Sequence, residues 1–176
     1  MLTLKIKSFE ELSAREVYEI LGARCDVFTV EQKICYPDAD GVDLHSLHVW
    51  LEAHDGTVEA YLRLYREDDG AGKTAGAYDS PAAEAHDSTT AGAHDSTIAG
   101  PVHMGRVLTR RHGEGLGRRV VEAGIEAAWT RMGADEIRLH SQEYCIGFYE
   151  KMGFRVCSSL FDEAGIPHAE MRLLRG

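Results

Sequence analysis

A glycine-rich turn with several arginines stands in the second half of the chain, where residues 110–119 read RRHGEGLGRR. Glycines let the backbone bring several N–H groups toward one point, and a helix that begins in such a turn adds the positive end of its dipole. Residues 105–119 hold five arginines and one glutamate. These features predict a pyrophosphate site. The alternative is a turn with solvated arginines, and the spacing fits neither a P-loop nor the GxGxxG fingerprint.

A second motif follows about 30 residues later, where residues 142–154 read QEYCIGFYEKMGF. In this order and spacing the two motifs resemble the GNAT superfamily of N-acetyltransferases. The glycine turn is similar to the family's pyrophosphate loop, commonly written Q/R-x-x-G-x-G/A, and FYEKMGF is similar to its second signature, N-x-x-A-x-x-F-Y-x-x-x-G-F. Residues 24–32 (RCDVFTVEQ), 36–41 (YPDADG) and 165–168 (GIPH) further resemble the ElaA-like branch.

The resemblance implies acetyl-coenzyme A (acetyl-CoA) as co-substrate, no metal, and a primary amine of a small molecule or peptide as acceptor. Gly115, Gly117, Phe148 and Tyr149 match the family motifs, whereas His112 stands where the family prefers Gln or Arg. The residues implied to contact the cofactor are Val107, Leu108, Thr109, His112, Gly113, Glu114, Gly115, Leu116, Gly117, Arg118, Gln142 and Phe148.

The implied reaction is direct attack of a neutral amine on the acetyl thioester. The strand at 107–109 would offer a backbone N–H to the thioester carbonyl, and Tyr149 would protonate the departing thiolate. A phenol with a pKa near ~10 suits a thiolate of similar basicity. The alternative role for Tyr149 is aromatic packing beside Phe148.

The general base is the role that the sequence leaves most open. His103, near the start of a predicted central strand, stands where many GNAT relatives place a strand carboxylate, so the resemblance makes it a candidate. Glu31 and Glu143 compete for the same role. The alternative for His103 is a surface or hydrogen-bonded structural position, which is commoner for a lone histidine on a strand.

Two other functions stay open beside acetyl transfer. One is a coenzyme A-binding sensor or interaction module without turnover, although the retained Tyr149 argues against it. The other is an acyltransferase of the same fold that takes a longer acyl thioester.

Residues 38–43 read DADGVD, so three aspartates alternate with other residues. A calcium loop of the EF-hand type would need a glutamate at its twelfth position, which is Val49 here. Two interpretations are left: a plain acidic turn, which we favour, and a surface that attracts a cationic amine.

Hydrophobic periodicity predicts the elements that must position these residues. Strands are expected at 3–7, 47–53, 58–65, 102–109, 136–141, 154–161 and 168–174. Helices are expected after Ser13 and at 24–32, 116–132 and 146–152. The expected fold class is mixed α/β (α+β), a central, mostly antiparallel mixed sheet flanked by helices, and the resemblance implies the GNAT-type acyl-CoA N-acyltransferase fold.

An internal repeat interrupts this pattern between about 68 and 100, where AYDS, AHDS and AHDS begin at 77, 85 and 93. The segment has too little apolar surface to offset the entropy of ordering, so we expect an exposed, dispensable insert. The alternative is a metal site built from His86, His94 and the neighbouring aspartates.

The length of 176 residues fits one domain, 1–176, and the net charge is −10. This charge argues against a nucleic-acid or anionic-membrane binder, and no apolar run reaches the ~18 residues of a membrane span. The four cysteines form no CxxC pair, so we interpret them as reduced thiols. We expect a cytoplasmic protein and leave a homodimer open.

Overall fold

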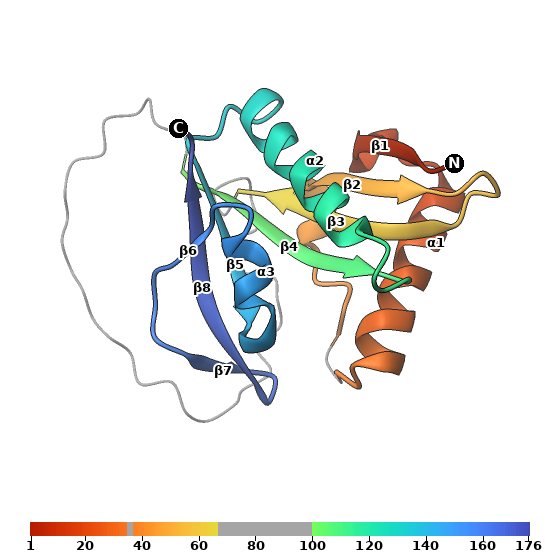
Figure 1. Ribbon diagram of the computed structural model, residues 1–176. Helices are drawn as coiled ribbons and strands as arrows, with labels where there is room; N and C mark the ends of the chain where they lie inside the picture. The colour runs from red at the N-terminus through yellow and green to blue at the C-terminus, as the bar shows by residue number, and fades with distance from the viewer. Residues whose placement is uncertain (35–36, 67–99) are drawn as a thin grey trace.

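A mixed sheet is the centre of the computed structural model, which describes residues 1–34, 37–66 and 100–176. Within these ranges the sheet has eight strands, with the order β1-β2-β3-β4-β5-β8-β6 and with β7 paired to β8 (Figure 1). The strands are β1 (Thr3–Ser8), β2 (Leu47–Glu52), β3 (Val58–Tyr65), β4 (Val102–Thr109), β5 (Glu136–Gln142), β6 (Arg155–Val156), β7 (Phe161–Glu163) and β8 (Ile166–Leu174). The predicted insert lies outside the described residues except for Gly100.

The β4–β5 pair is parallel, whereas the other strand pairs of the described sheet are antiparallel. β4 and β5 pair only at their amino ends, where Val102 faces Ile137 and His103 faces Arg138. Beyond these residues the two strands diverge, as Figure 1 shows. The sheet is therefore split along its middle toward the carboxyl ends of β4 and β5.

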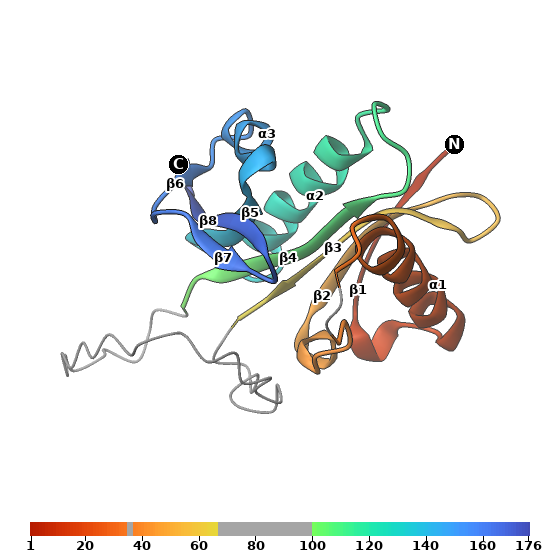
Figure 2. The ribbon, with the colours of Figure 1, turned by 90° about the horizontal axis from the view of Figure 1, so that it is seen from below.

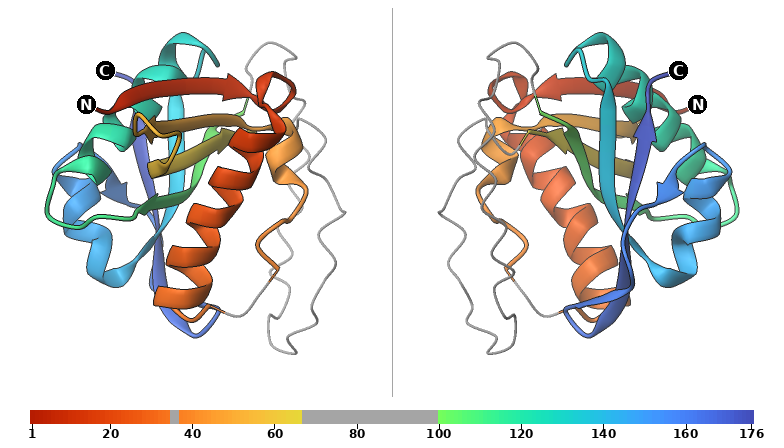
Figure 3. Two further views of the ribbon diagram at one scale, coloured as in Figure 1. Left: turned by 90° about the vertical axis from the view of Figure 1, so that its right-hand side faces the viewer. Right: turned by 90° about the vertical axis from the view of Figure 1, so that its left-hand side faces the viewer.

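Helices cover both faces of the sheet (Figures 2 and 3). The longer helices are α1 (Ala14–Arg24), the π-helix η2 (Cys25–Glu31) and α2 (Leu116–Thr130), and the shorter ones are η1 (Phe9–Glu11), η3 (Val42–His45), η4 (Glu143–Cys145) and α3 (Ile146–Glu150). Successive side chains of a strand point to opposite faces of the sheet, so the core has two parts. Val49 and Leu51 of β2 pack with residues of α2, while Trp50 packs with residues of α1. In the described ranges no helix is long and apolar enough to cross a bilayer.

Local sequence signals explain where the helices begin. Ser13 caps α1, since its hydroxyl accepts from the Glu16 N–H and the Glu16 carboxylate accepts from the Ser13 N–H. The helix predicted after Ser13 is therefore confirmed. The predicted mixed, mostly antiparallel sheet with flanking helices is confirmed as well.

Two predicted elements differ from the structure. The predicted helix at 24–32 is a π-helix that continues α1 without a break, and Gln32 N–H donates to Val27 O at its end. The strand predicted at 154–161 is wrong in its middle, because only β6 and β7 at its two ends pair with β8. The π-helix could not be predicted from hydrophobic spacing, which does not distinguish helix types over so short a segment.

Candidate active site

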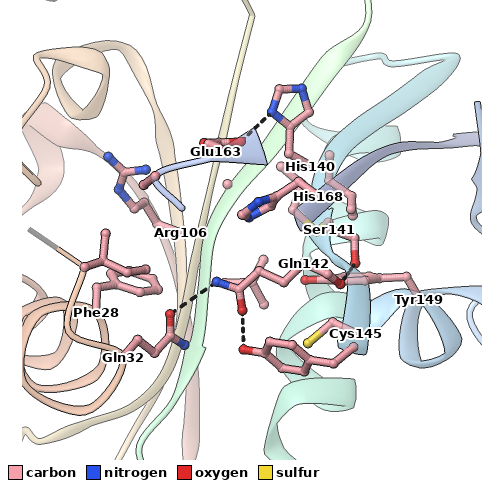
Figure 4. Close-up of a pocket in the computed structure, with 17 residues that line it drawn as sticks. Phe28, Gln32, Arg106, His140, Ser141, Gln142, Cys145, Tyr149, Glu163 and His168 are labelled. Atoms are coloured by element: carbon pink, nitrogen blue, oxygen red, sulfur yellow. Dashed lines mark hydrogen bonds and ion pairs between the residues drawn. The ribbon is translucent and has the colours of Figure 1, made fainter. Parts of the chain in front are cut away.

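A cavity opens where β4 and β5 diverge (Figure 4). β4 and β5 contribute Met104, Gly105, Arg106, Val107, Leu139, His140, Ser141 and Gln142. The remaining walls are Phe28, Gln32 and Ile34 from the π-helix and its end, Tyr144, Cys145 and Tyr149 beyond β5, and Glu163, Ala164 and His168 from β7 and β8. Three distant parts of the sequence thus meet at the split in the sheet.

A β-bulge on β4 shapes one wall of the cavity. Arg106 and Val107 together oppose Leu62 of β3, since the register shifts between Tyr61 and Arg63. Arg106 has φ = 54°, a left-handed conformation that is uncommon for a side chain other than glycine. A bulge interrupts the ladder, so it turns β4 backbone groups away from β3 and toward the divergent side.

Ion pairs hold the Arg106 side chain across the cavity rim. Its Nε donates to Asp38 Oδ1 at 2.9 Å, and its Nη2 donates to Asp40 Oδ2 at 3.1 Å. The loop before η3 is therefore tied directly to the bulge.

The aspartates of residues 38–43 belong to a buried ion network. Arg24 is fully buried and lies 2.7 Å from both Asp38 Oδ2 and Asp43 Oδ1, while Arg63 lies 2.5 Å from Asp40 Oδ2 and 2.9 Å from Asp43 Oδ1. Burial acts to raise the pKa of Asp43, but Arg24 and Arg63 outweigh it and hold that pKa below its usual range. The favoured interpretation as a plain acidic turn is wrong, because these carboxylates pair with buried arginines. The same ion pairs argue against the other interpretation, a surface that attracts a cationic amine.

The glycine-rich turn follows β4 and leads into α2. Gly113 (φ = 78°) and Gly115 (φ = 72°) are left-handed, a conformation that glycine adopts without penalty. The first bond of the helix runs from Arg119 N–H to Gly115 O, so the N–H groups of residues 116–118 precede it. Gly115 has no side chain to cap them. The start of α2 therefore offers N–H donors to an external anion, as predicted for a pyrophosphate site.

Acidic partners from outside the turn occupy most of its basic side chains. The pairs are Arg110 with Asp26 (2.6 Å), Arg111 with Glu59 (3.0 Å), Arg118 with Glu122 (2.7 Å) and His112 with Glu31 (3.1 Å). The charge count of residues 105–119 therefore overstates the positive charge that the folded turn presents. Exposed ion pairs are worth only ~0–1 kcal/mol each, so a phosphate can exchange with these acids at small cost.

Tyr149 lies in α3 with its side chain against the cavity. Its ring makes edge-to-face contacts with Phe148 and Phe154, with ring centroids 5.0 Å and 5.7 Å apart, and only 7% of the residue is exposed. Burial, with a smaller contribution from Cys145, raises the pKa of Tyr149. The phenol thus keeps its proton at neutral pH. Among the described residues its hydroxyl has no hydrogen-bond partner, so it is available to a reacting group.

Gln142 bridges the cavity from the end of β5. Its Nε2 donates to Gln32 Oε1 at 3.4 Å, and its Oε1 accepts from the Tyr144 hydroxyl. Each end of the amide therefore has one protein partner, which leaves one N–H of Nε2 and one lone pair of Oε1 for a pantetheine arm.

The structure places the predicted site residues in four different surroundings. Val107, Gln142 and Tyr149 line the cavity, and residues 112–118 form the turn at the carboxyl end of β4. Leu108 points instead into the core beneath α1. His103 stacks on Tyr65, with ring centroids 5.4 Å apart, and is outside the residues that line the cavity.

Sequence reasoning missed a polar group on the other wall, formed by His140, Glu163 and His168. Glu163 Oε2 lies 3.1 Å from His140 Nδ1, and this hydrogen bond lowers the pKa of Glu163. The GIPH segment at 165–168 contains His168, so the signal was present, but only as part of a branch resemblance and without an assigned role.

Comparisons with known proteins decide the family. The sequence family described as "Acetyltransferase (GNAT) domain" matches residues 65–175, more than half of the chain. The chain belongs to the GNAT family. A UPF0039 protein of Schizosaccharomyces pombe is 31% identical to this GNAT chain over 170 residues, which cover 95% of the chain and 93% of that protein.

Solved structures agree with this placement. The crystal structure of Escherichia coli ElaA has a TM-score of 0.76 at 26% identity, and an acyl-CoA N-acyltransferase from Pseudomonas aeruginosa has a TM-score of 0.75 at 29% identity. Each comparison covers 98% of the chain and 99% of the solved structure. This GNAT protein is therefore an acyltransferase of the ElaA-like branch.

Proposed function

We propose that this GNAT protein transfers the acetyl group of acetyl-CoA to a primary amine of a small molecule or peptide. The observation that carries the proposal is that the β4 bulge and Tyr149 line the same cavity, with the glycine turn at the carboxyl end of β4. A thioester in the split between β4 and β5 would then have a backbone donor on one side and a proton donor on the other. A pyrophosphate at the start of α2 would fix the same molecule at its far end.

The residues divide the work as follows. N–H groups of the turn bind the pyrophosphate, and Gly117 leaves room for it between Phe148 and Thr109. A backbone N–H in the bulge next to Arg106 polarises the thioester carbonyl. The amine nitrogen forms the C–N bond, the C–S bond breaks, and Tyr149 gives its proton to the departing thiolate.

We also propose that the protein works in the cytoplasm. Three cysteines of the described residues, Cys25, Cys145 and Cys157, are free thiols, as in proteins of a reducing compartment.

The test is release of free thiol from acetyl-CoA against a panel of polyamines, amino acids, aminoglycosides and peptide N-termini, with mass spectrometry of the amine. We expect one acetylated amine per thiol released. The same assay with octanoyl-CoA distinguishes an acetyltransferase from an acyltransferase that prefers longer acyl chains. Tight binding of acetyl-CoA with no acylated amine from any member would contradict the proposal and favour a binding module.

A further inference from the structure

Building on the proposed function, we infer that His168 is the general base, whose Nε2 takes the proton from the acceptor amine. The residue lies on β8, opposite Gln142 of β5 and Phe161 of β7. It is 9% exposed, and that exposure faces the cavity that Tyr149 also lines. Figure 4 shows its ring among the lining side chains, between Arg106 and Gln142.

Hydrogen bonding selects the tautomer that a base requires. His168 Nδ1 lies 2.8 Å from Ile166 O, and a carbonyl oxygen can only accept, so Nδ1 carries the hydrogen. In the neutral ring the lone pair is then on Nε2. In the described part of the chain, Nε2 has no hydrogen-bond partner. Stacking on Phe161, with centroids 6.2 Å apart and planes at 25°, holds the ring in this orientation.

Charged groups of both signs line the cavity together with His168. Glu163 is the carboxylate among the described lining residues, and its pKa is lowered first by its hydrogen bond with His140 and then by the charges of His140, His168 and Arg106. Arg106 is the guanidinium group on the rim of the same cavity, and it is paired with Asp38 and Asp40. The titratable groups that face His168 are Arg106 from β4, His140 from β5, Tyr144, Cys145 and Tyr149 from η4 and α3, and Glu163 from β7.

The other histidines are less well placed for this step. His103 stacks on Tyr65 at the closed end of the split and does not line the cavity. His140 lines it, and its bond to the Glu163 carboxylate also places the hydrogen on Nδ1, but half of the His140 side chain is exposed. Of these two cavity-lining histidines, His168 is the buried one, with 9% of the residue exposed.

The reaction balances with one base and one acid. The alkylammonium acceptor loses one proton to His168 Nε2, and its nitrogen forms the amide bond as the C–S electron pair leaves with sulfur. Tyr149 supplies the proton of the free thiol. As the amide forms, the nitrogen loses its second proton, and the tyrosinate takes up one proton in its place. The imidazolium releases its own proton to solvent, so the net products are amide, thiol and one proton.

The test compares His168→Gln with His103→Gln, the variant of the rival base, and with His54→Gln in the exposed β2–β3 turn as a matched control. The acceptor is the best amine from the panel, and kcat/KM is measured from pH 6 to pH 10. We expect a 10²- to 10³-fold loss for His168→Gln at neutral pH. The loss should shrink at high pH, where the amine is already neutral, while the Kd for coenzyme A stays within twofold of the parent.

Retention of kcat/KM within threefold by His168→Gln, or the same pH-dependent loss in His103→Gln instead, would overturn the inference. Nitrogen NMR of ¹⁵N-histidine protein gives a readout that needs no acceptor. The resonances present in the parent and missing from His168→Gln belong to His168. Their shifts should be those of a neutral ring with the hydrogen on Nδ1, and shifts of a ring with the hydrogen on Nε2 would overturn the assignment. Failure of the proposed function is distinguishable, since the parent protein would then acetylate no amine whatever the state of His168.

Discussion

Arg106 donates from Nε to Asp38 Oδ1 at 2.9 Å while its own backbone is left-handed, with φ = 54°. A left-handed residue other than glycine costs ~1–2 kcal/mol. The ion pairs to the loop at 38–43 hold the side chain in place and thereby the bulge beneath it. A charged loop distant in sequence thus positions the β4 backbone that faces the proposed thioester.

Replacement of Arg106 tests this strain. Both Arg106→Ala and Arg106→Gly lose the ion pairs, but only glycine relieves the left-handed backbone. We expect Arg106→Gly to be about 1 kcal/mol more stable than Arg106→Ala in urea unfolding, although glycine is the poorer residue in an ordinary strand. An alanine variant equal to or more stable than the glycine variant would show that the bulge carries no such strain.

The ion network should make stability depend on pH. Asp40 and Asp43 have lowered pKa values in the folded protein, so their contribution is full above the unfolded value of ~3.9 and is lost as the pH falls through the lower folded values. Asp43→Asn leaves Arg24 short of a partner and should lower the free energy of unfolding by about 3 kcal/mol at pH 7. The gap from the parent should narrow below pH ~4.

Urea unfolding at pH 7, 5 and 3 measures this gap. Asp26→Asn is the matched control, because Asp26 pairs with Arg110 at an exposed position and should cost no more than ~1 kcal/mol. A gap for Asp43→Asn that is equally wide at pH 3 and pH 7 would contradict the network's role.

Gly117 should admit the cofactor. A Cβ there would lie 3.5 Å from both the Phe148 ring and the Thr109 methyl, so the branches of valine would enter the space between them. Gly117→Val should fold, since its backbone is not left-handed. It should lose the stabilisation of about 2.7 kcal/mol that a hundredfold excess of acetyl-CoA over Kd gives the parent.

The measurement is the shift in melting temperature that acetyl-CoA causes in each variant. Gly147→Val in α3 is the control, because a Cβ at that position contacts nothing within 4 Å. An unchanged thermal shift in folded Gly117→Val would remove Gly117 from the site.

Tyr149 should act in the chemical step and not in binding. Tyr149→Phe keeps the ring and its contacts with Phe148 and Phe154, so the Kd for acetyl-CoA should change little. Single-turnover acetylation should fall by roughly 10²- to 10⁴-fold. Tyr18→Phe, at a residue 77% exposed on α1, is the control. Near-parental single-turnover acetylation by Tyr149→Phe would end the general-acid assignment.

Local signals were sufficient for much of the fold. The capping box of Ser13 and Glu16 and the glycines before α2 are encoded within a few residues, so the corresponding helix starts follow from the sequence. Tyr149 could be singled out because its motif is contiguous.

The cavity wall opposite Tyr149 could not be predicted in the same way. His140, Glu163 and His168 come together only because β5 and β7 both pair with β8 in a particular register. The aspartates at 38–43 looked solvated because their partners, Arg24 and Arg63, lie 14 or more residues away along the chain. Long-range pairings of this kind carry no local pattern.

Hydrogen exchange of the parent protein with and without acetyl-CoA tests the central claim most directly, because it locates the cofactor without any assumption about the amine. Binding in the split between β4 and β5 should slow exchange at residues 106–119 and 139–149. Protection confined to β1, η1 and α1, with none at β4, β5 or the glycine turn, would contradict the account.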